Sequence, residues 1–316
     1  MDVTNQFDVI IIGGGPAGLA AGLYAARMEL RAVLLDQGPS GGQLLNTELI
    51  EDYPGFESIL GHELASRMAE HARSFGLDIR EFEPVRDVDV DGANTKVVTL
   101  ESGAELRAPA VILAAGGLPR KLQVPGELEF AGRGTSYCAV CDGAFFRAEH
   151  LAVVGGGDAA LEEADFLTRY ASKVTILHRR DQFRAQPVLQ ARARANPKIE
   201  FILNAQVKEI YGDQKVRGIR YTQDGVEKDL AVGGVFIFVG FLPNAQLLKP
   251  HVDHDAAGYL VTDRNMQTSI PGIWAVGDVR AQLTKQIATA VGDGTTAAVA
   301  ASQYVDHLRD EERGAA

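Results

Sequence analysis

Cysteine is scarce in this chain of 316 residues, since only Cys138 and Cys141 occur. Two cysteines cannot build a disulfide-scaffolded domain or a four-cysteine zinc site within one chain. Basic residues are also the minority: 31 Lys and Arg stand against 42 Asp and Glu, which gives a net charge of −11. A protein this acidic is not expected to bind nucleic acid or an anionic membrane through bulk charge.

Long apolar runs are missing too, because no stretch reaches the roughly 18–20 residues that a transmembrane helix needs. The first residues lack the basic region and the small-residue cleavage site of a secretory signal. We therefore expect a soluble, cytoplasmic protein. No linker is rich in Pro or Ser, and at roughly 150 residues per domain the length indicates about two domains.

Glycine, by contrast, is abundant, with 34 residues, and is expected to mark tight turns and close backbone approaches. The first cluster, Gly13–Gly18, follows the apolar run Phe7–Ile12 and precedes a helical pattern that continues to Arg27. A second apolar run, Ala32–Leu35, then ends at Asp36. Strand, glycine-rich turn, helix, strand and acidic residue, in that order, form the first half of a dinucleotide-binding fold.

The glycines of this G-x-G-x-x-G pattern have separate tasks. Gly13 makes the tight turn, Gly15 lets a pyrophosphate approach the backbone, and Gly18 lets helix and strand pack closely. The phosphates are expected at the N-terminal end of the following helix. Asp36, 21 residues after Gly15, stands where a carboxylate accepts hydrogen bonds from ribose hydroxyls.

The same plan recurs later in the chain. An apolar run, Leu151–Val154, leads into the cluster Gly155–Ala160, a helical stretch to about Tyr170 and a strand-like segment, Lys173–Leu177. Two copies of one supersecondary plan predict two nucleotide sites, or one site and one relic.

The second copy ends in basic residues where the first ends in an acidic one. His178-Arg179-Arg180 follow the strand-like segment, and Arg184 comes shortly after. Arginines bind a 2′-phosphate through charge-assisted, often bidentate hydrogen bonds, whereas a carboxylate would repel it. We therefore expect the second site to prefer NADPH to NADH.

The two cysteines lie in the segment Cys138-Ala139-Val140-Cys141-Asp142, just before the second copy. Two thiols at this spacing can close a small disulfide ring, and one can attack a mixed disulfide formed by the other. The adjacent carboxylate can shuttle protons. Half of a zinc site shared between chains, or two buried thiols, are the alternatives, but the position before a dinucleotide fold favours redox chemistry.

Other segments give weaker signals. Gly277-Asp278 end an apolar run and could offer one carboxylate to a polyol chain, or form only a strand and a turn. Four residues with metal-ligating side chains lie close together: His251, Asp253, His254 and Asp255. A polar loop is the favoured interpretation of this group, and we predict no metal site.

Further strands are expected where the sequence alternates or runs apolar. These segments are Val88–Leu100, Glu105–Leu113, Ile199–Ile210, Val216–Tyr221 and Gly234–Val239. The segment Gln286–His307 has helical spacing, and the last residues, Asp310–Ala316, are expected to be frayed.

Together these residues resemble the low-molecular-weight thioredoxin reductases of the pyridine nucleotide–disulfide oxidoreductase class. The resemblance runs nearly end to end, and its motifs occur in the family's order: GGGPAG at 13–18, GGQL at 41–44, PG at 54–55, SYCAVCDG at 136–143, GGGDAA at 155–160, HRRDQFRA at 178–185, Gly240–Asn244, TSIPGIWAVGD at 268–278 and Gln286. The most specific motif is CxxC-Asp-Gly between two nucleotide folds, since glutathione reductases and their relatives keep their redox cysteines near the helix that follows the first strand.

The resemblance implies an α/β protein with two Rossmann-like dinucleotide-binding domains. The FAD-binding domain would comprise residues 1–117 and 246–316, and the NADPH-binding domain, residues 118–245, would be inserted into it and carry the CxxC motif. Nicotinamide and disulfide would take turns at one flavin through domain rotation, with hinges near Gly116–Arg120 and Gly240–Ala245. The family is homodimeric, uses FAD and NADPH, and acts on thioredoxin.

The resemblance also implies roles for single residues. Cys141 would face the flavin, Cys138 would attack the disulfide of thioredoxin, and Asp142 would be the acid–base group. The residues implied to bind FAD are Gly13, Gly15, Pro16, Ala17, Gly18, Asp36, Gln37, Gly42, Gln43, Leu44, Thr47, Asp52, Gly116, Gly277, Asp278, Val279, Lys285, Gln286 and Ile287. The residues implied to bind NADPH are Gly155, Gly157, Asp158, Ala159, His178, Arg179, Arg180 and Arg184.

Three positions depart from the family's usual pattern. Val140 stands where many relatives have Thr, Asp52 where Asn is common, and Lys285 where Arg is frequent. None of these changes removes a required group. The active-site residues do not identify the partner, so a glutaredoxin-like or peroxidase partner is the alternative to thioredoxin.

Overall fold

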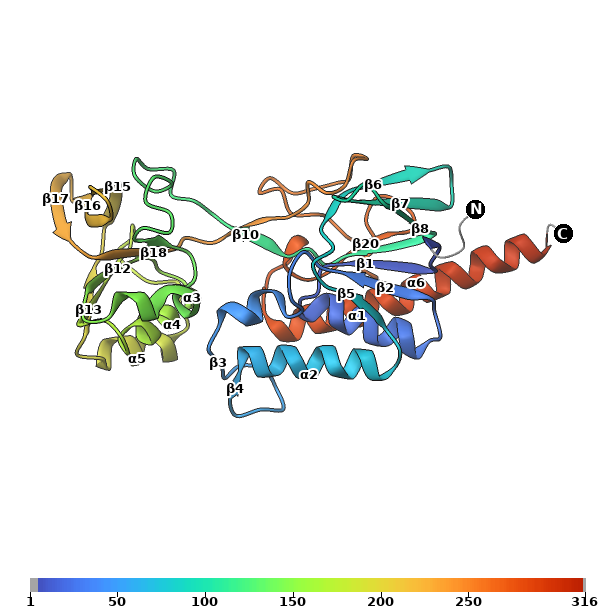
Figure 1. Ribbon diagram of the computed structural model, residues 1–316, viewed down its shortest axis with the longest axis horizontal. Helices are drawn as coiled ribbons and strands as arrows, with labels where there is room; N and C mark the ends of the chain where they lie inside the picture. Colours follow the sequence, from blue (N-terminus) through green and yellow to red (C-terminus); the bar gives the residue numbers. More distant parts are fainter. Residues whose placement is uncertain (1–4, 315–316) are drawn as a thin grey trace. The chain divides into compact units, whose positions relative to one another are not determined.

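The computed structural model describes residues 5–314 (Figure 1). The chain forms two compact units: a discontinuous unit, which runs up to Leu118 and resumes at Leu242, and an inserted unit, Pro119–Phe241. The chain crosses between them at β10 (Gly117–Pro119) and β19 (Phe241–Pro243), which pair with each other. Within the described residues, no helix is both long enough and apolar enough to cross a membrane.

The discontinuous unit is built on a five-stranded parallel sheet with the order β20-β9-β1-β2-β5. Its strands are β1 (Val9–Ile12), β2 (Ala32–Leu35), β5 (Asp78–Arg80), β9 (Ala110–Leu113) and β20 (Ile273–Ala275). The helices α1 (Pro16–Arg27), α2 (Gly61–Ser74) and α6 (Ile287–Gly314) lie on one face of this sheet, as Figure 1 shows. The other face carries an antiparallel sheet of β6 (Val85–Asp91), β7 (Thr95–Leu100) and β8 (Glu105–Ala108).

Shorter elements complete this unit. They are the hairpin β3 (Leu49–Ile50) and β4 (Ile59–Leu60) and the 3-10 turns η2 (Gly42–Asn46) and η4 (Gly277–Val279).

Burial on both faces explains why β1 is a continuous apolar run. Val9 and Ile11 belong to the core on the helical side of the sheet, together with residues of α1 and α6. Ile10 and Ile12 belong to the core on the other side, together with residues of β7 and β8. A strand whose two faces are both buried gains from apolar side chains at every position, so it shows no polar alternation.

The inserted unit repeats this three-layer plan. Its parallel sheet has the order β11-β18-β12-β13-β14. The strands are β11 (Thr135–Ser136), β12 (His150–Gly155), β13 (Lys173–Leu177), β14 (Ile199–Ile202) and β18 (Gly234–Phe238). One core joins this sheet to α3 (Ala139–Asp142), α4 (Asp158–Leu167) and α5 (Pro187–Ala195), and η3 (Gly143–Phe146) follows α3. A second core joins it to the antiparallel strands β15 (Ala205–Gly212), β16 (Val216–Gln223) and β17 (Val226–Ala231). The predicted α/β class is confirmed.

Several segments expected as single strands are pairs of strands. Val88–Leu100 divides at Gly92, whose φ of 72° makes the turn between β6 and β7. Glu105–Leu113 divides at Pro109, which has no N–H to donate to a ladder. Ile199–Ile210 divides at Asn204, which adopts a φ of 55° between β14 and β15.

The expectation for the end of the chain is wrong in part. Residues 310–314 were expected to be frayed, but α6 continues through Gly314. The last two residues of that prediction, 315–316, lie outside the described residues.

Candidate active site

Two glycines of the first turn are fixed by packing, and one is not. A Cβ atom on Gly18 would lie 1.8 Å from the carbonyl oxygen of Gly13, and one on Gly13 would lie 2.3 Å from the carbonyl oxygen of Ala114. A Cβ on Gly15 would meet only the Cα of Gly42, at 4.0 Å. Packing therefore requires glycine at 13 and 18, while the open space at Gly15 is the cradle that a pyrophosphate needs.

The segment after β2 closes over this turn. Gly41 N–H donates to the carbonyl oxygen of Gly14 at 2.8 Å, and Gly42, with a φ of 54°, is the first residue of η2. The first turn and η2, with Gln43 and Leu44, thus lie side by side although they are far apart in the sequence. Asp52 lies farther along this segment and is exposed.

Asp36 lies at the end of β2, and its carboxylate is directed at the turn. It accepts the backbone N–H groups of Gly14 and Gly38. Burial raises the pKa of Asp36, and the nearby Glu81 carboxylate adds to that effect, while the backbone hydrogen bonds oppose it. The carboxylate oxygens have further lone pairs, with which they can accept ribose hydroxyls.

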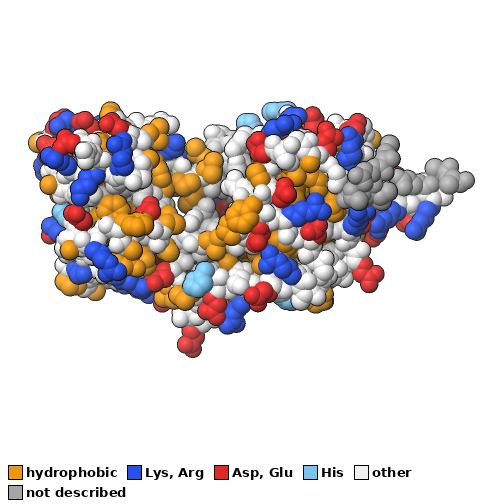
Figure 2. Space-filling model, viewed as in Figure 1, with side chains coloured by type: hydrophobic (Ala, Val, Ile, Leu, Met, Phe, Trp, Pro, Cys, Tyr) orange, Lys and Arg blue, Asp and Glu red, His pale blue; other side chains and the backbone are white. Residues whose placement is uncertain are grey.

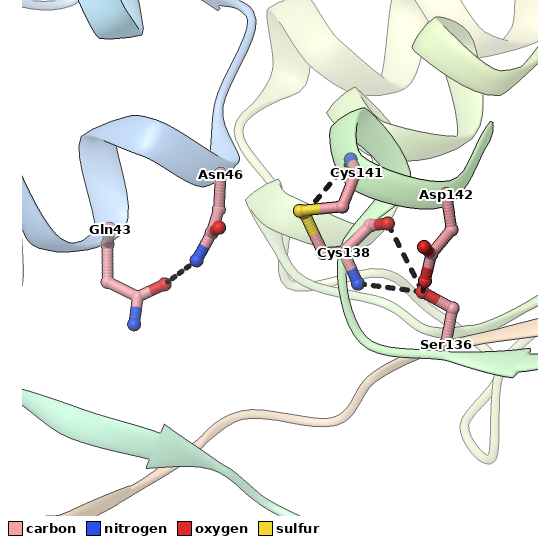
Figure 3. Close-up of a disulfide and its surroundings, with 6 residues drawn as sticks. All are labelled: Gln43, Asn46, Ser136, Cys138, Cys141 and Asp142. Carbon is pink, nitrogen blue, oxygen red and sulfur yellow. Dashed lines mark hydrogen bonds between the residues drawn. A yellow bond between two sulfur atoms is a disulfide. The ribbon is translucent and has the colours of Figure 1, made fainter. Parts of the chain in front are cut away.

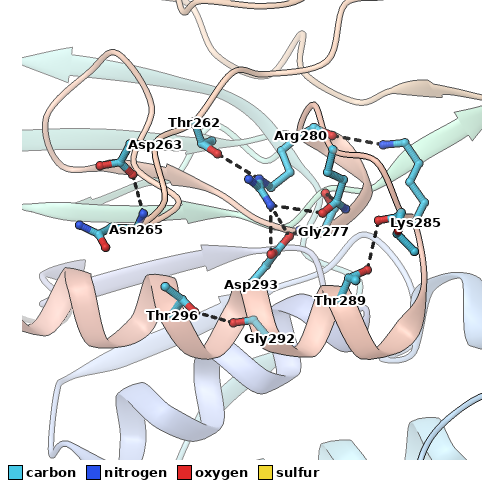
Figure 4. A network of polar contacts seen from close by, with 12 residues as sticks. Thr262, Asp263, Asn265, Gly277, Arg280, Lys285, Thr289, Gly292, Asp293 and Thr296 are labelled. Atoms are coloured by element: carbon cyan, nitrogen blue, oxygen red, sulfur yellow. Dashed lines mark hydrogen bonds and ion pairs between the residues drawn. The ribbon is translucent and has the colours of Figure 1, made fainter.

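The late Gly277-Asp278 pair begins η4, directly after β20 and Val276. Within residues 5–314, the half-buried Asp278 carboxylate accepts no hydrogen bond, and burial raises its pKa. Lys285 donates instead to the backbone carbonyl of Asp278 at 2.8 Å. It also donates to the backbone carbonyl of Arg280 at 3.2 Å (Figure 4). A half-buried carboxylate that accepts no hydrogen bond from the protein is suited to bind hydroxyl groups of a ligand.

The Lys285 side chain is held by contacts within the protein. Its Nζ atom lies 3.8 Å from the ring centre of Tyr259. Burial lowers the pKa of Lys285, although the nearby Asp278 and Asp255 carboxylates act against this shift. Its two hydrogen bonds hold the backbone around Asp278, so this side chain braces the turn on which Asp278 stands.

The second glycine turn shows the same division of tasks. A Cβ on Gly155 would lie 2.4 Å from the carbonyl oxygen of Phe238, and one on Gly156 would lie 2.2 Å from the His178 ring. Within the described residues, and apart from its chain neighbours, no atom lies within 4 Å of a Cβ built on Gly157. Gly157 therefore stands at an open cradle, as Gly15 does in the first turn.

The His178 ring packs against Gly156 of the second turn. Its side chain is buried, its Nε2 contacts the carbonyl oxygen of Gln182 at 3.0 Å, and its ring stacks on Phe183. Burial lowers the pKa of His178. Asp158 is likewise engaged within the unit, since its carboxylate accepts the backbone N–H and the side-chain amide of Gln186.

Three arginines stand free beside the second turn. Arg179, Arg180 and Arg184 are exposed, and within residues 5–314 none of them forms an ion pair. Arg184 N–H donates to the carbonyl oxygen of Gly156 at 2.8 Å, which fixes this loop to the turn. Figure 2 shows acidic and basic side chains intermingled over the visible face. A group of three arginines without acidic partners at one loop is therefore unusual in this acidic protein.

Cys138 and Cys141 form a disulfide at the start of α3. Cys141 N–H donates to Cys138 Sγ at 3.1 Å. The Ser136 hydroxyl donates to Asp142 Oδ2 at 2.6 Å and accepts the N–H of Cys138 at 3.1 Å (Figure 3). The disulfide and the carboxylate are thus joined through one hydroxyl, and the oxidised pair agrees with the redox interpretation of the motif.

A buried glutamate beside this site was missed by the sequence analysis. The Glu127 carboxylate accepts the backbone N–H groups of Leu122 and Gln123 and the hydroxyl of Tyr137, the residue before Cys138. Burial, with the Glu127 carboxylate adding to it, raises the pKa of Tyr137. No sequence signal could have found this cluster, because most of its partners are backbone groups.

Two dinucleotide-type turns and a reducible disulfide define a nucleotide-dependent disulfide oxidoreductase. The chain belongs to the pyridine nucleotide-disulphide oxidoreductase family, whose sequence model matches residues 7–294.

Comparison with individual proteins narrows this class to thioredoxin reductases. The chain is 48% identical over 313 residues to the thioredoxin reductase of Bacillus subtilis (strain 168), with 98% of each chain covered. The crystal structure of Lactococcus lactis thioredoxin reductase in its FR conformation matches with a TM-score of 0.93 at 46% identity, covering 95% of this chain and 99% of that one. Thioredoxin reductase from Streptococcus pyogenes MGAS5005 matches with a TM-score of 0.63 at 48% identity, covering 96% and 99%. The family resemblance found in the sequence is confirmed.

Proposed function

We propose that this protein is a thioredoxin reductase that passes electrons from NADPH through FAD and the Cys138–Cys141 disulfide to oxidised thioredoxin. The observation that carries the proposal is the disulfide within the same unit as an arginine-flanked dinucleotide turn. Similarity over 98% of both chains to a protein named thioredoxin reductase supports thioredoxin as the partner. We further propose that the enzyme is a homodimer and works in the cytoplasm, as the family resemblance implies.

FAD is assigned to the discontinuous unit because the residues there fit it. Gly15 leaves room for a pyrophosphate, Asp36 lies beside the turn to accept a ribose, and Asp278 offers the ribityl hydroxyls a carboxylate that accepts no hydrogen bond within the described residues. Gly42 and Gln43 on η2 and the start of α6 complete the proposed site. When bound, FAD would supply the two-electron link between nicotinamide and disulfide.

NADPH is assigned to the inserted unit. The open cradle at Gly157 suits a pyrophosphate, and the N-terminal end of α4 adds a favourable dipole. Arg179, Arg180 and Arg184 are exposed and free to bind a 2′-phosphate, which NADH lacks.

Transfer to thioredoxin is thiol–disulfide exchange. From the reduced pair, the Cys138 thiolate attacks one sulfur of the thioredoxin disulfide, which forms a mixed disulfide and releases one thioredoxin thiolate. The Cys141 thiolate then attacks Cys138 Sγ, which releases the second thioredoxin thiolate and restores the Cys138–Cys141 bond. Asp142, held by Ser136, exchanges the protons that the two thiols lose and thioredoxin gains.

Domain rotation would let nicotinamide and disulfide take turns at one flavin. The two crossing strands pair with each other, and Gly240, between β18 and β19, has a φ of 105° with no atom near its Cβ position. The two solved relatives have nearly equal identity to this chain but match it with TM-scores of 0.93 and 0.63. A rearrangement of the two units among solved relatives would produce such a spread, and this supports the proposal.

The direct test compares electron donors and acceptors on the purified protein. We expect a yellow protein that NADPH bleaches and that reduces thioredoxin much faster with NADPH than with NADH. Equal rates with the two donors would contradict the assignment of Arg179, Arg180 and Arg184 to the 2′-phosphate. Reduction of a glutaredoxin-like or peroxidase partner, with thioredoxin left oxidised, would favour the alternative function.

A further inference from the structure

Both backbone polar groups of Gly277 are held by side chains. Its N–H donates to Asp293 Oδ2, on α6, at 3.1 Å, and its carbonyl oxygen accepts from Gln282 Nε2 at 3.1 Å. Gly277 has a φ of 68°, so the backbone turns sharply here. The residue immediately after this clamped position is Asp278, the carboxylate assigned to the flavin.

Arg280 connects the two side chains that hold Gly277. Its Nη1 atom donates to both carboxylate oxygens of Asp293, at 3.1 and 3.2 Å, and to Gln282 Oε1 at 3.2 Å. Its Nε atom donates to Thr262 Oγ1 at 3.0 Å (Figure 4). The Arg280 guanidinium therefore links three side chains around the Gly277 turn. These are Thr262 on a loop, Gln282 after η4 and Asp293 on α6.

Burial makes this network sensitive to the loss of any member. The side chains of Arg280 and Asp293 are only 14% and 10% exposed. Removing the arginine would leave the Asp293 carboxylate buried without its cation, which is more costly than the loss of an exposed ion pair. A lysine would keep the charge, but its single ammonium lacks the planar fork that lets Arg280 reach Thr262, Gln282 and Asp293 together.

We propose that Arg280 is a positioning residue for flavin binding: through Asp293 and Gln282 it fixes the Gly277 turn and so aims the Asp278 carboxylate at the ribityl chain. This inference rests on the proposed function, because it assumes that FAD occupies the discontinuous unit. It assigns a role to three residues outside the predicted cofactor contacts, namely Arg280, Gln282 and Asp293.

The test measures FAD binding to flavin-free protein, with no turnover involved. Trp274, the only tryptophan of the chain, lies three residues before Gly277, so quenching of its fluorescence reports the flavin. We expect Arg280→Met to weaken FAD binding by roughly tenfold or more, as for the loss of charged hydrogen bonds. Arg280→Lys should weaken it nearly as much, because the fork and not the charge is required.

A double-mutant cycle tests whether Arg280 acts through Asp278. In a protein that already carries Asp278→Ala, adding Arg280→Met should change FAD affinity little, because the carboxylate to be positioned is gone. Asp293→Asn, which keeps an oxygen for the Gly277 N–H but loses the ion pair, should give an intermediate loss and serves if Arg280→Met fails to fold. Arg264→Met is the matched control, since Arg264 is exposed on the loop that carries Thr262 and forms no ion pair within residues 5–314.

The outcomes separate this inference from the proposed function. If the unaltered protein takes up no FAD, the proposed function itself fails. If it takes up FAD and Arg280→Met or Arg280→Lys binds FAD equally well, only the positioning role is overturned. An Arg280→Met effect of the same size with and without Asp278 would also overturn it, because the arginine would then act independently of that carboxylate.

Discussion

At the residue scale, the proposed nucleotide preference of each unit rests on single charged residues. Asp36 directly follows β2, and Arg179 is the second residue after β13, so the two lie at nearly the same place in each copy. Their opposite charges are the basis for the proposed opposite preferences for a 2′-phosphate. This assignment could be made from sequence, because the spacing from glycine turn to charged residue is short and local. The role of Arg280 could not, because its partners lie on a loop and on α6 and meet only in the folded unit.

Replacing Arg179 and Arg180 together with glutamine should raise the KM for NADPH and leave that for NADH nearly unchanged. Each lost charged hydrogen bond to phosphate is worth about 1.5–3 kcal/mol, so we expect on the order of a tenfold or greater loss of discrimination. Steady-state kinetics with NADPH and with NADH measures both KM values and the discrimination between the two donors. Arg217→Gln is the control, because Arg217 lies on β16, away from the second turn, and pairs with Asp213. A discrimination ratio that stays unchanged would show that the 2′-phosphate binds elsewhere.

At the scale of elements, the two strand–turn–helix motifs could be predicted because their signals are local. Each consists of an apolar run, a glycine pattern and a helical period. The divisions at Pro109 and Asn204 lie inside apolar segments, so periodicity alone did not separate the strands there. The pairing of β20 with β9 joins residues far apart in the chain, and no local pattern specifies such a partner. The continuation of α6 to Gly314 was likewise missed, because charged residues near a chain end resemble a frayed terminus.

Within the second turn, Gly155 and Gly157 should respond differently to alanine. Gly155→Ala places a methyl group 2.4 Å from the carbonyl oxygen of Phe238, so it should destabilise the fold by about 1–3 kcal/mol, seen as a lower Tm. Gly157→Ala meets no protein atom, so it should leave Tm nearly unchanged and weaken NADPH binding. Thermal unfolding and NADPH titration of both variants make the comparison. Unimpaired NADPH binding by Gly157→Ala would argue against a pyrophosphate at that cradle.

For the whole molecule, the proposed mechanism has the two units change their arrangement between half-reactions. The chain connects them only through two short segments, and Gly240 adopts a backbone conformation there that other residues avoid. Hinge residues are those that absorb changes in φ and ψ, so a side chain at this position should restrict the motion.

We therefore expect Gly240→Ala to lower kcat for thioredoxin reduction severalfold while FAD stays bound. Gly103→Ala is the matched control, because Gly103 also has a positive φ, 86°, and open space at its Cβ position, but lies between β7 and β8. Both variants carry similar backbone strain, so thermal stability should fall alike. Equal turnover in the two variants would count against a hinge at Gly240.

The central claim is that electrons from NADPH reach the Cys138–Cys141 disulfide by way of FAD. Anaerobic incubation with NADPH, followed by thiol alkylation and intact-mass measurement, tests it directly, since both cysteines of the chain lie in that bond. We predict that the FAD-loaded protein gains two alkyl groups per chain and that flavin-free protein gains none. A disulfide that stays closed while NADPH bleaches the flavin would contradict the account.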